Sequence, residues 1–280
     1  MSTFFGIIVG MGLLLVAIIL QGGIGIFFNL EAIMIVFGGT IAATFISYPL
    51  PRVLKVMGIS LNIFRRDFQE PSGHIQRIVQ LAHTARKNSV LSLEGEGRKI
   101  KNRILKLGVE MLVDGHPPEF IREVLETELD FLQVRHRSGE QVFRSAAKFA
   151  PAFGLIGTLI GLIAMMRNLG GSDANASIGK GMAVALVGTF YGAMLANLFL
   201  LPVSEKLKSR TEEEVLRGRI IIEGVLLIQA GVNPRIVEKK LNAFLPPEMR
   251  TSYSKRLARS AQTSKGGETR EREAEKVAAS

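Results

Sequence analysis

The chain has 280 residues, with 35 Lys and Arg against 25 Asp and Glu, and a net charge of +10 at pH 7. It contains no cysteine, which excludes a disulfide, a thiolate nucleophile and a thiolate metal site. The charge is unevenly distributed, because residues 1–30 carry none and uncharged runs return at 32–51, 149–166 and 181–204. The sequence does not interleave basic with aromatic residues as nucleic-acid surfaces do, so we expect no nucleic-acid partner.

The uncharged runs predict four transmembrane helices. A helix of 18 residues spans about 27 Å, which is close to the thickness of the hydrocarbon core of a bilayer. We expect spans at roughly 3–20, 30–48, 149–166 and 182–201, and none has the polar face of a soluble helix of this length. A signal peptide explains the first run less well, because a basic start and a small-residue cleavage site are missing and a second span follows at once.

The basic residues predict the topology and the domain order. Seventeen of them lie within 51–148 and 16 after residue 201, whereas the two short connections hold only Arg167 and Lys180. The positive-inside rule therefore places both long segments and both termini in the cytoplasm. The predicted fold class is an all-α membrane protein. We expect membrane helices at 1–50, a cytoplasmic helical domain at 51–148, membrane helices at 149–203, cytoplasmic helices at 204–250 and a disordered tail at 251–280.

Within the long cytoplasmic segment, apolar residues such as Leu105, Val109 and Leu112 recur at helical spacing. The stretches QEPSGH (69–74) and GHPPEF (115–120) predict breaks, with Pro117 and Pro118 opening the next helix. The four histidines are scattered over this segment, so we expect them to be solvated and not to bind a metal.

Motifs for catalysis are missing from the sequence. There is no G-x-S-x-G and no H-E-x-x-H, and Gly179–Lys180 lacks the other residues of a phosphate loop. We therefore expect no enzyme, no catalytic residue, no cofactor and no metal.

Ion pathways normally place an ionisable group inside the membrane. No Asp, Glu, Lys, Arg or His lies in the middle of any predicted span, and Glu31 is at the outer edge of the second. If ions pass, a partner chain must supply the carboxylate.

Small residues form one stripe on each of the last two predicted spans. Such faces let helix backbones approach closely in lipid, and the predicted packing residues are Gly154, Gly157, Gly161, Gly188 and Gly192. Thr158 and Thr189 lie on or beside these stripes. Each either bonds to the carbonyl of its own preceding turn or lines a path, and the sequence leaves both possibilities open. Pro151 similarly reads either as a helix start or as a hinge.

Four stretches carry a resemblance to a known family. They are IVFGGTIAATFISYP (35–49), ARKNSVLSLEGE (85–96), APAFGLIGTLIGL (150–162), and MAVALVGTFYGAMLAN (182–197) followed by Pro202. ARKNSVLSLEGE is the most specific, because it lies outside the membrane, where hydrophobicity alone cannot produce a match. With these stretches the sequence resembles the MotA/PomA stator subunits of the bacterial flagellar motor, related to ExbB/TolQ, over nearly the whole chain apart from the tail.

The resemblance implies a pentamer around two copies of a MotB-like partner, which supplies an ion-carrying aspartate. Translocated H⁺ or Na⁺ would turn the pentamer against the rotor protein FliG. Carried over from the family motifs, Arg86, Lys87, Glu94 and Glu96 would meet the rotor, Pro151 and Pro202 would couple conformations, and Thr158 and Thr189 would face the partner. Arg86 and Glu94 share a helical face only if SVLS (89–92) continues the helix.

Two points stay open after the resemblance. In the family a threonine at the position of Thr158 is common in sodium types, but Gly188 stands where those types often have a second threonine. We favour a proton. The alternatives to a stator are an ExbB/TolQ-like energiser, a group that usually has three spans, and a structural membrane scaffold in which the glycine faces only hold an oligomer together.

Overall fold

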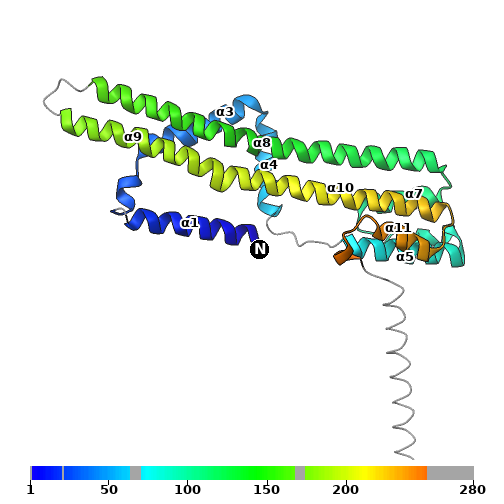
Figure 1. The fold of residues 1–280 in the computed structure, drawn as a ribbon. Helices are drawn as coiled ribbons and strands as arrows, with labels where there is room; N and C mark the ends of the chain where they lie inside the picture. The colour runs from blue at the N-terminus through cyan, green and yellow to red at the C-terminus, as the bar shows by residue number, and fades with distance from the viewer. Residues whose placement is uncertain (1, 21, 64–70, 168–173, 251–280) are drawn as a thin grey trace, which may run out of the picture. The chain divides into compact units, whose positions relative to one another are not determined.

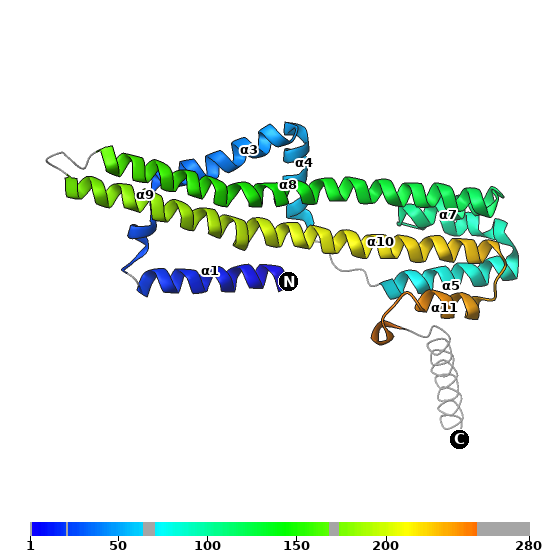
Figure 2. The same ribbon diagram turned by 45° about the horizontal axis from the view of Figure 1, so that its top comes forward.

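The computed structural model describes residues 2–20, 22–63, 71–167 and 174–250, and nearly all of them are helical (Figures 1 and 2). The predicted all-helical fold is therefore confirmed for the described part of the chain, and the predicted tail at 251–280 lies outside it. The chain divides into two compact units, 1–67 with 133–212 and 68–132 with 213–280. Two long helices, α8 (Pro118–Arg167) and α10 (Leu201–Gln229), contribute residues to both units.

The first unit contains the apolar helices. Its elements are α1 (Ser2–Leu20), the 3₁₀ turn η1 (Ile24–Phe27), α2 (Leu30–Ile33), the π-helical η2 (Met34–Gly38), α3 (Gly39–Ser47), α4 (Leu50–Ile63), the second part of α8, α9 (Ala174–Met194), the π-helical η4 (Leu195–Leu200) and the start of α10. Three helical stretches are long and apolar enough to cross a membrane, and they lie in Leu30–Ser47, Pro118–Arg167 and Ile178–Gln229. A shorter apolar helix covers Ile8–Leu20.

The third predicted span differs from the structure in one respect. It is not a separate helix, because α8 runs without interruption for 50 residues and contains Pro151 in its interior. The reading of Pro151 as a helix start is therefore wrong. Charge marks where a helix leaves the apolar phase, but Glu, Lys, Arg and Gln are good helix formers, so the helix itself continues past that point.

Side-chain contacts in the first unit tie the second span to α8. The Tyr48 hydroxyl lies 2.8 Å from the Ser145 hydroxyl and donates to the backbone carbonyl of Gln141 at 3.3 Å. Below this contact Val53, Val56 and Val142 are buried together. At the other end Asn29 caps α2, since its side-chain oxygen accepts from the backbone N–H of Ala32 at 2.9 Å.

The second unit is a helical bundle with an apolar core. Its elements are α5 (Pro71–Asn88), the 3₁₀ turn η3 (Val90–Leu93), α6 (Glu94–Gly97), α7 (Arg103–Val113), the first part of α8, the rest of α10, α11 (Pro234–Asn242) and η5 (Pro247–Met249). The fully buried side chains include Ile78, Leu105, Leu125, Ile221 and Leu241. This core therefore joins residues before the third predicted span to residues after the fourth.

The helix boundary predicted at GHPPEF is confirmed. Helix α7 ends at Val113, Gly115 takes a positive φ of 75°, and α8 begins at Pro118. Glycine tolerates that backbone conformation, and proline suits the first turn of a helix, whose N–H groups have no intrahelical partner. Of the other predicted break, the structure describes only the start of α5 at Pro71.

The expectation of solvated histidines is wrong for two of the four, because His74 and His116 are partly buried. Burial, and secondly the positive charge of Arg217, hold the pKa of His74 below its usual value of 6.5. A histidine with a lowered folded-state pKa stabilises the fold above pH 6.5. That contribution is lost as the pH falls from 6.5 through the folded pKa, because the unfolded chain then binds the proton more tightly.

We expect His74→Gln to reduce the pH dependence of stability. Between pH 8 and pH 5.5 the melting temperature of the wild-type chain should fall further than that of the variant, since the variant has no group to protonate at this position. Thermal unfolding of the purified chain followed by circular dichroism measures the difference. Equal declines in the two proteins would show that His74 does not carry this linkage.

Candidate functional site

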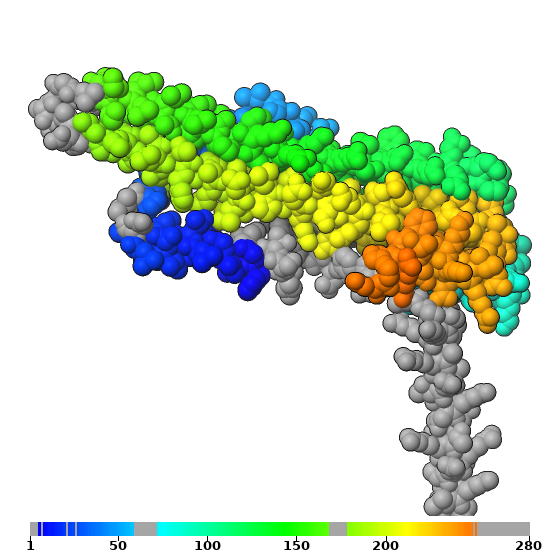
Figure 3. Space-filling view, viewed as in Figure 1, coloured from blue at the N-terminus to red at the C-terminus, as the bar shows by residue number. Residues whose placement is uncertain are grey.

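The backbones of α8 and α9 approach each other closely at glycines. A Cβ added to Gly161 would lie 2.5 Å from the carbonyl oxygen of Gly181, and one added to Gly192 would lie 2.6 Å from that of Ala150. Gly154 is tight as well, with 3.1 Å to the carbonyl oxygen of Gly188. Figure 3 shows α8 in green lying along α9 in yellow-green. These positions have no room for a side chain, because the neighbouring atoms belong to backbone.

The other two predicted packing residues are less constrained. A Cβ on Gly188 would find its nearest neighbour at 3.8 Å, and one on Gly157 at 3.7 Å, which are ordinary van der Waals distances. Both residues are buried, but alanine fits at either position. The stripe read from the sequence is therefore divided into glycines that set the helix spacing and glycines that merely lie beside it.

Thr158 and Thr189 meet across the two helices. Their hydroxyl oxygens lie 2.6 Å apart. The Thr158 hydroxyl is also 3.1 Å from the carbonyl oxygens of Gly154 and Ala185, and the Thr189 hydroxyl is 3.1 Å from that of Ala185. Each threonine thus reaches the carbonyl of its own preceding turn, which was one of the two predicted possibilities, and also touches the other threonine. That the pair lines a path stays a prediction. Thr158 is half-buried, whereas Thr189 is exposed on the surface of this chain.

The hydrogen-bond count of this pair determines what it can bind. Two hydroxyls carry two hydrogens, of which one bridges the oxygens and the other reaches a backbone carbonyl. Neither hydrogen is left for an outside group. Several oxygen lone pairs remain, so Thr158 and Thr189 together form an acceptor. The chemistry suits a protonated carboxyl, a hydronium ion or a small cation better than a carboxylate anion.

Pro151 lies where α8 meets Gly192. Proline has no N–H, so the carbonyl of Ala147, four residues earlier, loses its intrahelical partner. On the facing helix, a Cβ on Gly192 would come within 3.1 Å of the Pro151 Cα. The helix therefore continues through Pro151 with a local weakness at one of its closest contacts with α9.

Pro202 lies just after a π-helical segment. The wider turns of η4 (Leu195–Leu200) end two residues before Pro202, which is the second residue of α10. Proline removes the N–H that would bond to the carbonyl of Leu198 and crowds that carbonyl. A π-helical turn relieves this crowding, and such turns are frequent at functional sites. Both predicted coupling prolines therefore lie in continuous helices whose hydrogen bonding is interrupted.

The predicted rotor-facing residues lie on a bend in the second unit. Arg86 and Lys87 occupy the exposed last turn of α5, and Glu94 begins α6 after the η3 turn. SVLS does not continue the helix, because Ser89 takes a φ of 81° and Val90–Leu93 form a 3₁₀ turn. Arg86 and Glu94 thus do not share one helical face. Glu94 pairs with Arg98 at 3.2 Å.

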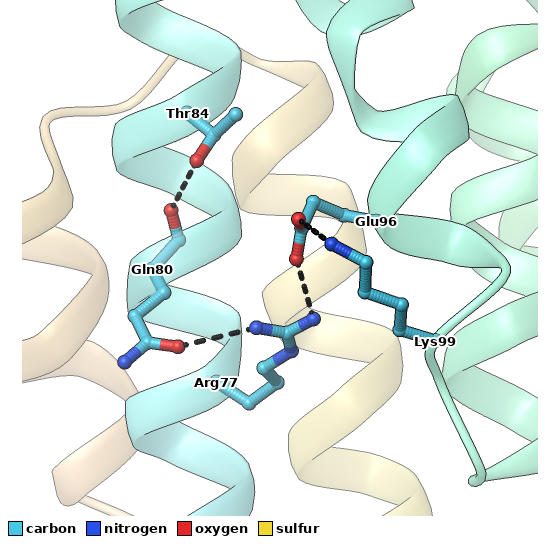
Figure 4. Close-up of polar contacts among 5 residues, drawn as sticks. All are labelled: Arg77, Gln80, Thr84, Glu96 and Lys99. Carbon is cyan, nitrogen blue, oxygen red and sulfur yellow. Dashed lines mark hydrogen bonds and ion pairs between the residues drawn. The ribbon is translucent and has the colours of Figure 1, made fainter.

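Glu96 is held by two cations, as Figure 4 shows. Its carboxylate lies 2.7 Å from the Arg77 guanidinium and 3.1 Å from the Lys99 ammonium, and its side chain is only 31% exposed. The hydrogen bond from Lys99, and then that from Arg77, lower the pKa of Glu96. Gln80 accepts from Arg77 at 3.4 Å. Glu96 therefore fastens α6 to α5, whereas Arg86, Lys87 and Glu94 are the exposed members of the predicted set.

Several contacts in the first unit were not found from the sequence. Gly39 lies against the ring of Phe153 with no room for a Cβ. The Tyr191 hydroxyl donates to the backbone carbonyl of Phe27, and Phe27 stacks edge-on with Phe190 at 5.6 Å. The only signal available was a tyrosine within an uncharged run, since a buried phenol usually finds a hydrogen-bond partner.

The fold and the close glycine contacts together define a class of protein: a helical membrane protein whose apolar helices pack against one another at glycines. Comparison with known proteins agrees with this class. A family model described as the MotA/TolQ/ExbB proton channel family matches residues 96–219. Curated relatives include a chemotaxis protein PomA of Vibrio alginolyticus, 38% identical over 88% of this chain and 95% of its own length. A motility protein A of Borreliella burgdorferi is 40% identical over 91% of this chain and 97% of its own length.

Two solved structures have a similar fold. A Campylobacter jejuni MotAB structure matches with a TM-score of 0.82 at 27% identity, covering 90% of this chain and 98% of its own. A flagellar MotAB stator complex from Bacillus subtilis matches with a TM-score of 0.80 at 32% identity, covering 88% of this chain and 96% of its own. The chain belongs to the MotA/TolQ/ExbB proton channel family. Because this is a family of channels, the chain is not an enzyme, as its sequence predicted.

We expect Gly192→Ala to disrupt the helix pair and Gly188→Ala to leave it intact. The first methyl group would overlap the Ala150 carbonyl, and overpacking of this kind costs about 1–3 kcal/mol. The second would enter ordinary contact, so it serves as a matched control one turn away. Thermal unfolding of the two purified variants in detergent distinguishes them. A pair of equal melting temperatures would contradict the close approach of α8 and α9.

Proposed function

We propose that this chain is the A-type subunit of a flagellar motor stator, which works with a MotB-like partner to convert ion flux into torque on the rotor protein FliG. The observation that carries the proposal is the extent of the match. Relatives named motility protein A or PomA align with 80–91% of the chain, including the segment 85–96 outside the apolar helices. The family model alone also includes TolQ and ExbB proteins, which would energise other periplasm-spanning partners.

In the bacterial inner membrane, the chain has four spans and both termini in the cytoplasm. Three spans are the long apolar helices, and α1 is the fourth, with 19 residues and no charge. The distribution of Lys and Arg supports this topology, because 33 of the 35 lie within 51–148 or after residue 201. The second unit, which contains Arg86 and Glu94, is then cytoplasmic and accessible to a rotor.

The ion passes along the surface formed by α8 and α9, and a partner helix supplies the carboxylate. This division of labour is required because no Asp, Glu, Lys, Arg or His lies within 149–166 or 181–204. The solved neighbours are MotAB complexes, which supports a MotB-like partner. Five copies of this chain surround two copies of the partner. Thr158 and Thr189 accept a hydrogen bond from the protonated partner carboxyl, which favours H⁺ as the coupling ion over Na⁺.

The energy available per ion is sufficient to change a conformational equilibrium. One charge moving through about 150 mV releases roughly 3.5 kcal/mol, from about 2.3 kcal/mol per 100 mV. A two-state element responds to this energy only if the ion binds its two states differently. Pro151 and Pro202 suit that element, because each interrupts the hydrogen bonding of a helix that lines the path.

The decisive experiment is complementation of a motile bacterium that lacks its own stator A subunit. This chain is expressed with its MotB-like partner, and swimming speed is measured with and without sodium at fixed membrane potential. We expect motility in both media. Arg86→Glu should abolish it by reversing the charge offered to the rotor, and Pro151→Ala by restoring the missing helix bond.

Each other outcome has a definite meaning. Motility that requires sodium would keep the stator function and reverse the choice of ion. A complex that assembles in the membrane without restoring motility would contradict the stator proposal and favour an ExbB/TolQ-like energiser or a scaffold. Unchanged motility in Arg86→Glu would remove that residue from the rotor contact.

We expect Thr189→Val to lose motility and Thr189→Ser to keep it. Valine preserves the shape but removes an acceptor, and leaving a buried donor such as the partner carboxyl unsatisfied costs about 1–3 kcal/mol, which is about a 5- to 150-fold change in occupancy. In either variant the Thr158 hydroxyl keeps its hydrogen bond to the Gly154 carbonyl, so the fold should persist. Swimming speed is measured beside the amount of assembled complex. Motile Thr189→Val cells would exclude the hydroxyl from the ion path.

A further inference from the structure

The turn between α5 and α6 holds Ser89 in a strained conformation. Its φ of 81° and ψ of 163° fall in a region that is essentially restricted to glycine. Among the described residues Ser89 is the one non-glycine residue with a positive φ. Backbone strain of this kind persists only where the surrounding structure determines it, and it is found mainly at functional sites.

Several contacts hold the turn in place. The backbone N–H and the hydroxyl of Ser92 both donate to the carbonyl of Ser89, at 3.2 and 2.6 Å. Beyond the turn, the ion pair between Arg77 and Glu96 fastens α6 back to α5 (Figure 4). Leu93 is completely buried in the core of the second unit. The turn is therefore rigid and does not depend on any outside contact for its shape.

This geometry points Leu91 outward. In a 3₁₀ turn, side chains three residues apart lie above one another. Val90 and Leu93 accordingly share the inner face, where Val90 packs against the core. Leu91 and Glu94 share the outer face, and Leu91 is 70% exposed. A rigid turn thus places a leucine next to the carboxylate that the sequence assigned to the rotor.

Charged residues flank this leucine along the chain. Arg86 and Lys87 are exposed at the end of α5, and Glu94 is paired with Arg98, whose side chain is 81% exposed. These four exposed side chains are three cations and one carboxylate, so together they carry net positive charge. A single exposed leucine is unremarkable in itself. At binding hot spots an apolar side chain supplies the central contact and polar neighbours exclude water from it.

We propose that Leu91 is the apolar anchor of the rotor contact, inserted into an apolar recess of FliG that acidic side chains border. The inference rests on the proposed stator function, which assigns this surface to the rotor. The acidic border follows from charge complementarity to Arg86 and Lys87. Leu91 supplies binding energy by desolvation, whereas the charges supply steering and orientation. Ser89 is a positioning residue, because it turns the chain so that Leu91 is exposed.

The test uses the full chain with its MotB-like partner in lipid nanodiscs, and purified FliG from the same bacterium. Binding is measured at 0.1 M and 1 M NaCl. Leu91→Ser should raise the Kd at least about 10-fold at both concentrations, because an apolar contact is not screened. Arg86→Glu should weaken binding at 0.1 M and much less at 1 M, where the Debye length is about 3 Å.

Two control variants separate anchoring from folding. Ile236→Ser changes another exposed aliphatic residue of the same unit, 57% exposed on α11, and should leave the Kd unchanged. Leu91→Met keeps an apolar side chain and should retain binding. Wild-type affinity in Leu91→Ser, with binding still weakened in Arg86→Glu, would overturn the anchor and leave the stator function standing. Absence of FliG binding by the wild-type complex would overturn both.

Discussion

The close approach of α8 and α9 is the constraint on which the membrane part of the structure depends. Between helices in lipid there is no hydrophobic driving force, so association rests on packing and on hydrogen bonds between helices. Gly161 and Gly192 remove the side chains that would keep the two backbones apart. The spacing that results is what brings the hydroxyl oxygens of Thr158 and Thr189 to 2.6 Å. Polar chemistry at this depth is thus a consequence of glycine packing.

The same constraint explains why helices that must pack so tightly also contain prolines. Two uninterrupted helices with complementary faces pack in one arrangement, and their packing and backbone hydrogen bonds oppose any change of it. Pro151 and Pro202 each remove a backbone hydrogen bond within a helix that otherwise continues. The π-helical segment before Pro202 shows how the backbone accommodates the loss. Tight packing fixes the spacing of the two helices, and the two interrupted positions are where their backbone hydrogen bonding is weakest, which is the basis of the proposed coupling role.

The sequence predicted the parts of this molecule that depend on local pattern. Uncharged runs marked the apolar helices, and Pro118 marked the start of α8. It did not reveal that α8 continues through Pro151, because tertiary packing and good helix formers on the charged side outweigh one missing hydrogen bond. Nor did it separate Gly192 from Gly188, which differ only in what lies opposite on another helix. Such differences arise from contacts between segments that are distant in the chain.

The segment from Arg86 to Glu96 shows the limit of reasoning from charge alone. Four charged residues in one motif looked equivalent, but the structure gives them different tasks. Glu96 is paired with Arg77 and Lys99, so it fastens α6 to α5. No glycine marks the positive φ at Ser89, so sequence patterns predict a continuing helix as readily as a bend. Once the bend is known, the 3₁₀ geometry of the turn determines which of its side chains are buried and which are exposed. It buries Leu93 and leaves Leu91 and Glu94 outside, so this segment exposes an apolar side chain as well as charged ones.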